Sequence, residues 1–337
     1  MHARAHPSAD PIYAAILELR KTREGAAIET ACAGCHSPRA APGIAATTGV
    51  TCAACHNVAA VHAGKVGANA LERATAQLLL GPHDIPAGAT VAHGTGPAAS
   101  HLTDGVTICG ACHERLNSQH GVSMCATGQE LADGGSTQTC VGCHMPIVDG
   151  PSGVMSSRKT HRRHTFGGPH RAWYQDDPEV LQRAVTLLGT LTHDALRLTL
   201  TNRTGHAFPT GFPGRQAILE IEGYDSLGTL VWRGASAGST TPSPVIMGKR
   251  YEDAAGKPTL APWSVRLAKD SRLKAAEARQ ITIARPPEVV RVVARLTFRL
   301  LPKALASKIG MAMAPEAVPK TIKELELKLP IVAAPTD

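Results

Sequence analysis

The sequence predicts an α+β protein with two unlike parts: an irregular, helical N-terminal part and an all-β, sandwich-like C-terminal part. Three observations lead to this prediction. All 9 cysteines lie in the first half of the chain. Aromatic residues make up only 3% of the chain, too few to build a conventional apolar core in that half. From about Asp177 onward, short apolar runs alternate with turn residues, as in an antiparallel sandwich.

One pentapeptide, Cys-x-x-Cys-His, occurs four times in the N-terminal half. With 9 Cys and 16 His in 337 residues, roughly a hundredth of one match is expected by chance. The pattern is the attachment signature of a c-type haem, because two thiols on one side of a helical turn can both reach the vinyl groups of one porphyrin. The histidine that follows then binds the iron. The motifs therefore predict four covalently attached haem c groups, with attachment residues Cys32, Cys35, Cys52, Cys55, Cys109, Cys112, Cys140 and Cys143 and proximal ligands His36, His56, His113 and His144.

Zinc is the alternative interpretation of these cysteines. The pairs Cys32/Cys35 and Cys52/Cys55 are separated by 16 residues, which fits a zinc ribbon. The other two pairs are separated by 27 residues and do not fit. Zinc also gives no reason for a histidine to follow every second cysteine, so haem is the preferred interpretation. Cys125 lies outside the motifs and is expected to be a plain thiol.

The chain has a net charge of +8. A basic chain suggests nucleic acid or an acidic membrane surface as a partner. Here the excess is better explained by the propionates of four haems, about eight negative charges. No nucleic-acid partner is therefore expected. The basic run 158–164 is either a propionate-binding cluster or a solvated loop, and both interpretations stay open.

Haem is attached covalently outside the bacterial cytoplasm, so a periplasmic or extracellular location is expected. The first residues lack the apolar segment of a signal peptide, and no stretch reaches membrane-spanning length. We therefore expect no membrane span, and either a mature, trimmed chain or a misplaced start. Four porphyrins would supply the apolar bulk that the N-terminal half lacks, so residues 1–175 are expected not to fold without haem.

Local patterns predict the main elements. Asp10 and Pro11 precede a set of apolar residues with helical spacing, which marks a helix start. Residues 65–80 are predicted as a helix, and 81–105 as a loop. Six to eight short strands are expected in the C-terminal part, with candidates at 184–191, 195–202, 216–224, 229–233, 279–284, 289–301 and 321–329. The boundary is placed near 173–178, giving a tetrahaem domain at 1–176 and a sandwich at 177–337.

The N-terminal region resembles a known family through six pieces of sequence: Met1-His2-Ala3-Arg4-Ala5-His6, Cys35-His36-Ser37-Pro38, Gly49-Val50-Thr51-Cys52 through His56, Cys109 through His113, Cys143-His144-Met145-Pro146 and His164-Thr165-Phe166-Gly167-Gly168. These are similar to the cytochrome c-554-like multihaem proteins, over residues 1 to about 172. The C-terminal part looks like a companion domain of the same proteins. Such proteins commonly carry one more Cys-x-x-Cys-His upstream, so the resemblance implies a longer natural product with a signal peptide and one more haem.

Each haem iron also needs a sixth ligand, and 12 histidines lie outside the motifs. Methionine is the rival ligand, but only 7 are present. His2, His62 and His164 match positions at which the family supplies a histidine. His206 is in a tight loop bounded by Gly and Pro, where it is either a ligand docked onto the haem part or a structural histidine. His2 could instead serve an upstream haem. His101 and His120 are weaker candidates, and His193 is predicted to be solvated in a hairpin turn.

Two functions are compatible with these features. The first is electron transfer between closely packed, mostly bis-His haems, with redox proteins as partners and the sandwich as a docking module. A variant is a subunit of an extracellular filament, or another homo-oligomer, in which a histidine of one copy binds a haem of the next. The second is a multihaem oxidoreductase, in which one five-coordinate haem acts on a small nitrogen or sulfur compound. No catalytic cluster stands beside one motif, so the carrier is preferred over the enzyme.

Overall fold

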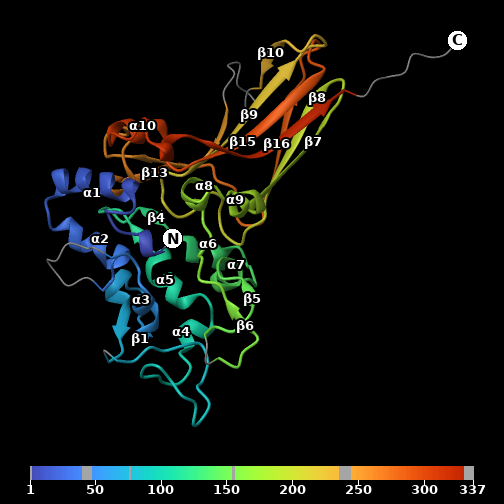
Figure 1. Ribbon diagram of the computed structural model, residues 1–337. Helices are drawn as coiled ribbons and strands as arrows, with labels where there is room; N and C mark the ends of the chain where they lie inside the picture. The colour runs from blue at the N-terminus through green and yellow to red at the C-terminus, as the bar shows by residue number, and fades with distance from the viewer. Residues whose placement is uncertain (1, 40–47, 76, 154–155, 235–243, 330–337) are drawn as a thin grey trace.

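The computed structural model describes residues 2–39, 48–75, 77–153, 156–234 and 244–329. It has two parts that meet along one side (Figure 1). Short helices, hairpins and loops form the N-terminal part, and two large antiparallel sheets and a two-stranded ribbon form the C-terminal part. Helices α8 (Arg171–Tyr174) and α9 (Glu179–Ala184) connect them. The observed arrangement is the α+β architecture that the sequence predicts.

Each haem motif forms the last turn of a helix, and the motif histidine is the final helical residue. The first helix, α1 (Pro11–Glu24), carries no motif and begins as predicted, because the Asp10 carboxylate accepts a hydrogen bond from the Tyr13 amide at 3.1 Å. The motif helices are α2 (Ile28–His36), α3 (Cys52–His56), α5 (Thr107–His113) and α7 (Cys140–His144). The remaining helices here are α4 (Ser100–Thr103) and α6 (Thr127–Asp133).

Small hairpins fill the N-terminal part between these helices. They are β1 (Val58–Val61) with β2 (Leu71–Arg73), β3 (Leu116–Asn117) with β4 (Ser123–Cys125), and β5 (Ile147–Asp149) with β6 (Thr160–Arg162). The predicted helix at 65–80 is wrong. A short 3-10 turn, η2 (Gly67–Ala70), leads there directly into β2. Leu71 and Leu78 have helical spacing, but tertiary pairing of β2 with β1 overrides this local preference and decides the conformation.

The C-terminal part is a sandwich of two antiparallel sheets. One has the strand order β10-β9-β15-β16, with β11 also paired to β9, and the other has the order β14-β8-β7. Six of the predicted strands are confirmed as β7 (Val185–Leu191), β8 (Ala195–Asn202), β9 (Gln216–Tyr224), β10 (Leu230–Arg233), β14 (Ala278–Ala284) and β16 (Lys320–Lys328). The run predicted at 289–301 contains β15 (Arg291–Arg299). The β7–β8 hairpin turns at His193, which is exposed as expected.

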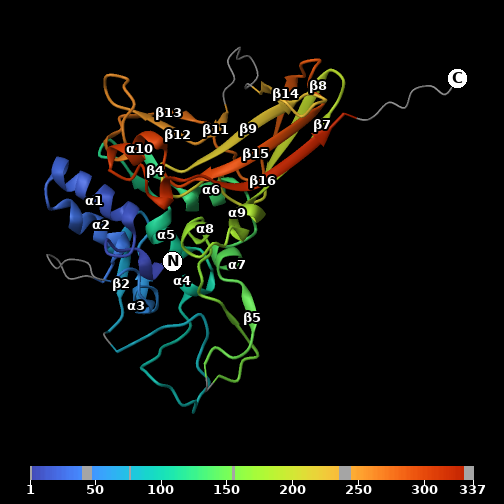
Figure 2. The same ribbon diagram turned by 45° about the horizontal axis from the view of Figure 1, so that its top comes forward.

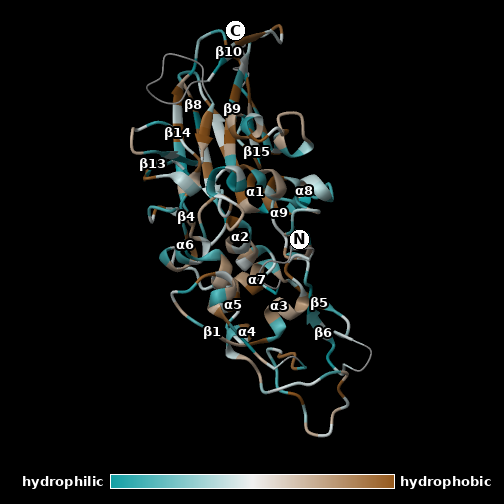
Figure 3. Ribbon diagram, turned by 90° about the vertical axis from the view of Figure 1, so that its left-hand side faces the viewer, coloured by the Kyte–Doolittle hydropathy of each residue, from teal (hydrophilic) through white to brown (hydrophobic). Residues whose placement is uncertain are grey.

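Three short strands were missed: β11 (Val245–Met247), β12 (Lys249–Glu252) and β13 (Arg266–Asp270). β12 and β13 form a separate ribbon of mixed polar composition, which carries no clear alternating pattern. The main apolar core lies between the two large sheets and includes Leu198, Leu219 and Phe298. Hydropathy colouring shows apolar residues along β8 and β9 (Figure 3).

The two parts share contacts at one end of the sandwich. Helix α1 lies beside α10 (Lys303–Lys308) (Figures 1 and 2), and Ile12 belongs to the same buried cluster as the sandwich residues. The Glu24 carboxylate accepts hydrogen bonds from Trp263 Nε1 and Gln119 Nε2, both at 2.8 Å. No helix among the described residues has the length and apolar character that crossing a membrane requires.

Candidate haem sites

Three of the four motif histidines face a second imidazole. The ring centroids of His113 and His2 are 6.2 Å apart, those of His56 and His164 6.1 Å, and those of His144 and His206 6.4 Å. Two imidazoles on opposite sides of one metal have centroids about 6.2–6.4 Å apart, given a metal–nitrogen bond of about 2.0–2.1 Å and a ring radius of about 1.1 Å. The spacing therefore fits an iron atom between each pair.

Hydrogen bonds at Nδ1 fix the orientation of four of these rings. His56 Nδ1 lies 2.7 Å from the Leu80 carbonyl, and His144 Nδ1 lies 2.5 Å from the Gly167 carbonyl. His164 Nδ1 lies 2.9 Å from the Arg162 carbonyl, and His206 Nδ1 lies 3.0 Å from that of Ala207. A ring that donates from Nδ1 to a carbonyl keeps the Nε2 lone pair for a metal. These histidines are thus held in the tautomer that an axial ligand needs.

The segment 164–168 serves all three pairs. His164 faces His56, and the Gly167 carbonyl binds His144. Phe166 packs edge-on against His2, with centroids 4.3 Å apart, and lies 5.8 Å from His164. The whole segment carries the family resemblance, but His164 is its one residue that the sequence predicts as a ligand. The roles of Phe166 and Gly167 depend on long-range contacts, which one local motif does not reveal.

His2 is anchored against the segment that precedes the second motif. Its carbonyl accepts a hydrogen bond from the Val50 amide at 3.0 Å. A Cβ on Gly49 would lie 2.5 Å from the same carbonyl oxygen, so only glycine permits this approach. Burial is the main cause that lowers the pKa of His2 to about 4, and His113 adds to it. The ring is therefore neutral near pH 7, as metal binding requires.

His206 reaches the N-terminal part from the loop after β8. Asn202, which is buried, donates from Nδ2 to the carbonyls of His206 and Lys274, at 2.7 and 2.8 Å. Its Oδ1 accepts from the amide of Thr204 at 2.9 Å. These bonds fix the loop, and the His206 ring lies nearly parallel to that of His144, at an interplanar angle of 11°. The sandwich therefore contributes a candidate ligand to the haem part.

His113 combines two properties that indicate an internal gap. Its residue surface is exposed, yet desolvation by the surrounding protein is the main cause that lowers its pKa. A ring that is enclosed by protein and still accessible faces a space within the fold. A porphyrin bound to Cys109 and Cys112 would occupy space next to this ring, so the site fits the group that the motif predicts.

The first motif differs from the other three. Its histidine, His36, is stacked on Tyr13, with centroids 4.0 Å apart and an interplanar angle of 16°, and its Nδ1 lies 3.2 Å from the Ala5 carbonyl. A parallel ring at this distance packs on the face of the imidazole and does not occupy the position opposite a bound iron. No second imidazole is paired with His36 in the part of the chain that the structure describes. Tyr13 was not identified from the sequence.

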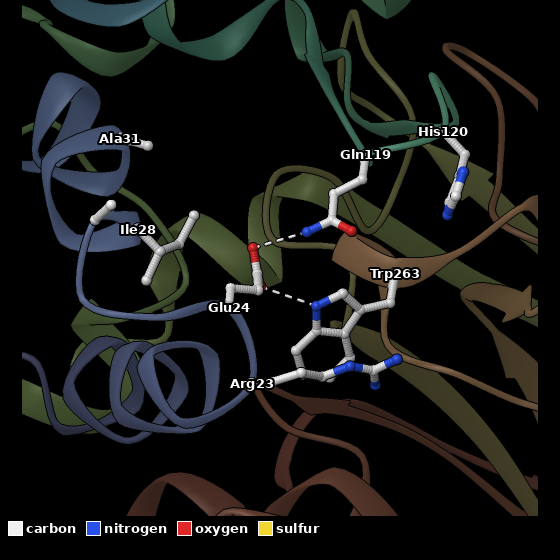
Figure 4. Close-up of a pocket in the computed structure, with 8 residues that line it drawn as sticks. Arg23, Glu24, Ile28, Ala31, Gln119, His120 and Trp263 are labelled. Atoms are coloured by element: carbon white, nitrogen blue, oxygen red, sulfur yellow. Dashed lines mark hydrogen bonds between the residues drawn. The ribbon is translucent and has the colours of Figure 1, made fainter.

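A cavity of about 550 Å³ lies beside the helix that carries this motif (Figure 4). Ile28 and Ala31 of α2 form one side, and Gln119 and His120 form the other. Arg23 stacks on Trp263 at 4.0 Å from the ring centroid. His120, a weaker candidate ligand, is exposed and lines this cavity.

Two other predicted ligands do not face a motif histidine. His62 has a side chain that is 45% exposed and lies 3.2 Å from the Glu72 carboxylate. Its proposed axial role therefore receives no support from the geometry. His101 is 5% exposed, and its Nε2 is buried without a hydrogen-bond partner among the described residues. Burial lowers its pKa, and nearby Asp104 raises it.

No disulfide joins any of the 9 cysteines, and the eight motif cysteines form four Cys-x-x-Cys pairs. Cys35 lies near Cys112, and Cys109 lies near Cys140, so the first, third and fourth motifs adjoin one another. No three His, Cys, Asp or Glu side chains of the described ranges converge as metal ligands. The zinc-ribbon alternative thus finds no tetrahedral site there. Cys125 is buried, at 8% exposure.

The basic run 158–164 has a partly structural role. Arg162 Nη1 donates to the carbonyl of Met145 at 3.1 Å and lies 3.4 Å from that of Val141. This side chain therefore braces the fourth motif from outside. Arg163 is exposed.

No protein-family model and no curated protein matches this chain. Among solved structures, the chain is similar to the crystal structure of a penta-haem cytochrome c552 from Thermochromatium tepidum. The identity is 24% over 97% of this chain and 93% of that chain, with a TM-score of 0.78. The two proteins share a fold. The match to a second solved structure, a structural-genomics target, covers 45% of this chain with a TM-score of only 0.18.

Proposed function

We propose that this chain is a multihaem c-type cytochrome that transfers electrons between four covalently attached haems. The observation that carries the proposal is the 6.1–6.4 Å separation of three imidazole pairs, each containing one motif histidine. In this assignment His2, His164 and His206 are the distal ligands for the third, second and fourth motifs. The shared fold with a penta-haem cytochrome supports the class, and the four motifs of this sequence support the count.

The proposed haems lie close enough to exchange electrons directly. Cys35 lies near Cys112 and Cys109 lies near Cys140, so the attachment sites of three of the proposed haems are neighbours. Phe166 touches the distal ligands of two different haems. Iron changes its oxidation state by one electron in such a group, and the protein fixes the axial ligands that set its potential. Paired imidazoles favour low potentials relative to a methionine ligand.

Single distal substitutions test this assignment in the haem-loaded protein. We expect His164→Gly, His206→Gly and His2→Gly each to convert one haem from low spin to high spin, measured by electron paramagnetic resonance of the oxidised protein. His62→Gly is the matched control, because His62 is exposed and lies next to Glu72. Retention of a fully low-spin spectrum in all three variants would contradict the assignment. Absence of a Soret band from the purified, exported protein would reject the function itself.

The first motif favours a second candidate function. Among the described residues, the ring that stacks on His36 is the phenol ring of Tyr13 and not a second imidazole. A haem at this motif with an open sixth position would suit a multihaem oxidoreductase that acts on a small nitrogen or sulfur compound. A high-spin signal in the unmodified protein, together with turnover of nitrite, hydroxylamine or sulfite, would favour this enzyme. A spectrum with only low-spin haems would favour the carrier.

The proposed location is the periplasm or the cell exterior, because haem is attached there. Redox proteins are the proposed partners, and the domain boundary near 176 stays a proposal. The filament variant predicts ordered polymers in electron micrographs of the purified protein. A single species of about 35 kDa plus haem in solution would argue against it.

A further inference from the structure

Arg215 is a half-buried cation without an ionic partner in the described part of the chain. It directly precedes β9, and its Nε is buried with no hydrogen-bond partner there. Its Nη1 donates to the Thr210 carbonyl at 2.8 Å, which leaves most of the guanidinium unpaired. An unpaired buried charge is costly, so such a group usually has an anion beside it. The described residues do not provide that anion.

The chain makes room for this guanidinium. Gly211 has a φ of 80°, and a Cβ at this position would lie 2.6 Å from Arg215 Nη1. A side chain there would both strain the backbone and displace the arginine. Arg215 keeps some accessible surface, although desolvation is the main cause that lowers its pKa to about 10. The guanidinium therefore faces a gap inside the fold, as His113 does.

The nearby carboxylates are already engaged. Asp10 caps α1 through the Tyr13 amide, and Glu130 is paired with Arg272 at 2.7 Å. Four other titratable groups interact electrostatically with Arg215. They are Cys125 and the histidines His113, His170 and His206. None of these groups is an anion that could neutralise the guanidinium when a haem is bound. His113 and His206, the ligands proposed for the third and fourth haems, are both within electrostatic range of the arginine.

We propose that Arg215 binds a haem propionate and thereby neutralises it inside the protein. The guanidinium fork matches a carboxylate in shape and charge, and the third and fourth motif haems are the two that place an axial ligand beside it. This inference rests on the proposed haem binding. It assigns the sandwich a second role next to that of His206, because one loop supplies both a candidate axial ligand and the counter-charge.

A redox titration of the haem-loaded protein tests this role. Loss of a positive charge beside a haem stabilises ferric iron, so Arg215→Gln should lower one midpoint potential while the haem content stays constant. We expect at least a tenfold change in the ratio of oxidised to reduced haem, which is about 59 mV for one electron. Arg215→Lys keeps the positive charge and should restore most of the unmodified midpoint potential. Arg299→Gln is the matched control, because its Nε is also unpartnered but its charged neighbour is Glu220.

Two further experiments identify the anion beside Arg215 and the haem whose potential responds. If the anion is a covalently held propionate, the change in midpoint potential caused by Arg215→Gln should be the same at low and high chloride. Loss of this change at high chloride would show that the anion is an exchangeable ion and would overturn the proposal. His206→Met should raise the potential of the fourth haem and so mark it. Adding Arg215→Gln to this variant then shows whether the marked haem or another one responds.

The negative outcomes are distinct. Midpoint potentials that all stay within the range of the Arg299→Gln control would overturn the propionate contact alone. Absence of haem from the unmodified protein would instead reject the proposed function. If the Arg215→Gln variant cannot be produced with its haems, resonance Raman spectroscopy of the Arg215→Lys variant tests the propionate contact instead. An unchanged propionate bending band would reject the contact, and a shifted band would support it.

Discussion

The two parts of this molecule are built on different principles. The sandwich buries large aliphatic and aromatic side chains such as Leu198, Leu219 and Phe298, with exposures of about 1%. The N-terminal part buries mainly small residues, among them Ala54, Ala70 and Ala111, and Val58 is its single member among the largest fully buried side chains described. Apolar packing thus accounts for the stability of the sandwich. The N-terminal part has too little apolar packing and depends, in our proposal, on covalently attached porphyrins.

Preventing haem attachment gives the largest expected difference between the two parts. In the chain produced without haem, amides of α1 to α7 should exchange with solvent at nearly unfolded rates. Those of β8, β9 and β15 should stay protected, because their hydrogen bonds and core do not involve haem. Hydrogen exchange with mass spectrometry measures both parts in one sample. Protected helices in the haem-free chain would contradict the dependence that we propose.

A cavity in the sandwich core should give the next largest effect. Phe298 is 1% exposed and contacts Phe208, with ring centroids 5.8 Å apart. Phe298→Ala should lower the free energy of unfolding of the sandwich by about 3–5 kcal/mol. Denaturant titration followed by circular dichroism measures this loss. The control is Leu227→Ala, because Leu227 is 89% exposed and its loss should change stability very little. Equal effects of the two substitutions would show that the core has been wrongly located.

A smaller effect is expected at the contact between the two parts. Glu24 binds Arg20 within α1, Gln119 from the β3–β4 loop, and Trp263 from the C-terminal part. Glu24→Gln should lower the free energy of unfolding by about 1–3 kcal/mol, since it removes charge-assisted hydrogen bonds. Trp263 fluorescence during denaturant titration follows the contact.

The loss should depend on pH in a defined direction. The hydrogen bond from Arg20 is the main cause that lowers the pKa of Glu24. A carboxyl with a lowered folded-state pKa contributes stability above its unfolded pKa of about 4.3, and this contribution is lost as the pH falls through the folded value. The difference between the unmodified protein and Glu24→Gln should therefore be full at pH 7 and shrink below about pH 4. A difference independent of pH would point to lost packing alone.

The sequence predicted the sandwich well because its strands carry their own signal. Runs such as 216–224 and 195–202 match the observed β9 and β8, since apolar burial on the sheet requires a local pattern. The helix predicted at 65–80 failed because pairing of β2 with β1 is a long-range contact. β12 and β13 were missed for a related reason. They form a polar ribbon whose side chains do not alternate.

The candidate sites show the same limit. Four motif histidines could be named from the sequence, because five consecutive residues encode each attachment. Their partners were also among the candidates named from the sequence, but the motif that each one faces was not, because only the fold brings His2 to His113 and His206 to His144. His62 follows a motif closely, yet the structure places it next to Glu72. Proximity in sequence is thus a poor guide to the second axial ligand.

The position of His206 has a consequence for how this chain could be shortened. The loop that holds it belongs to the sandwich, and Asn202 fixes that loop from within β8. In our assignment, a chain cut before β7 would not be a smaller carrier. It would leave one iron open to water and to diffusible gases such as carbon monoxide, and an electron relay would become a ligand-binding protein.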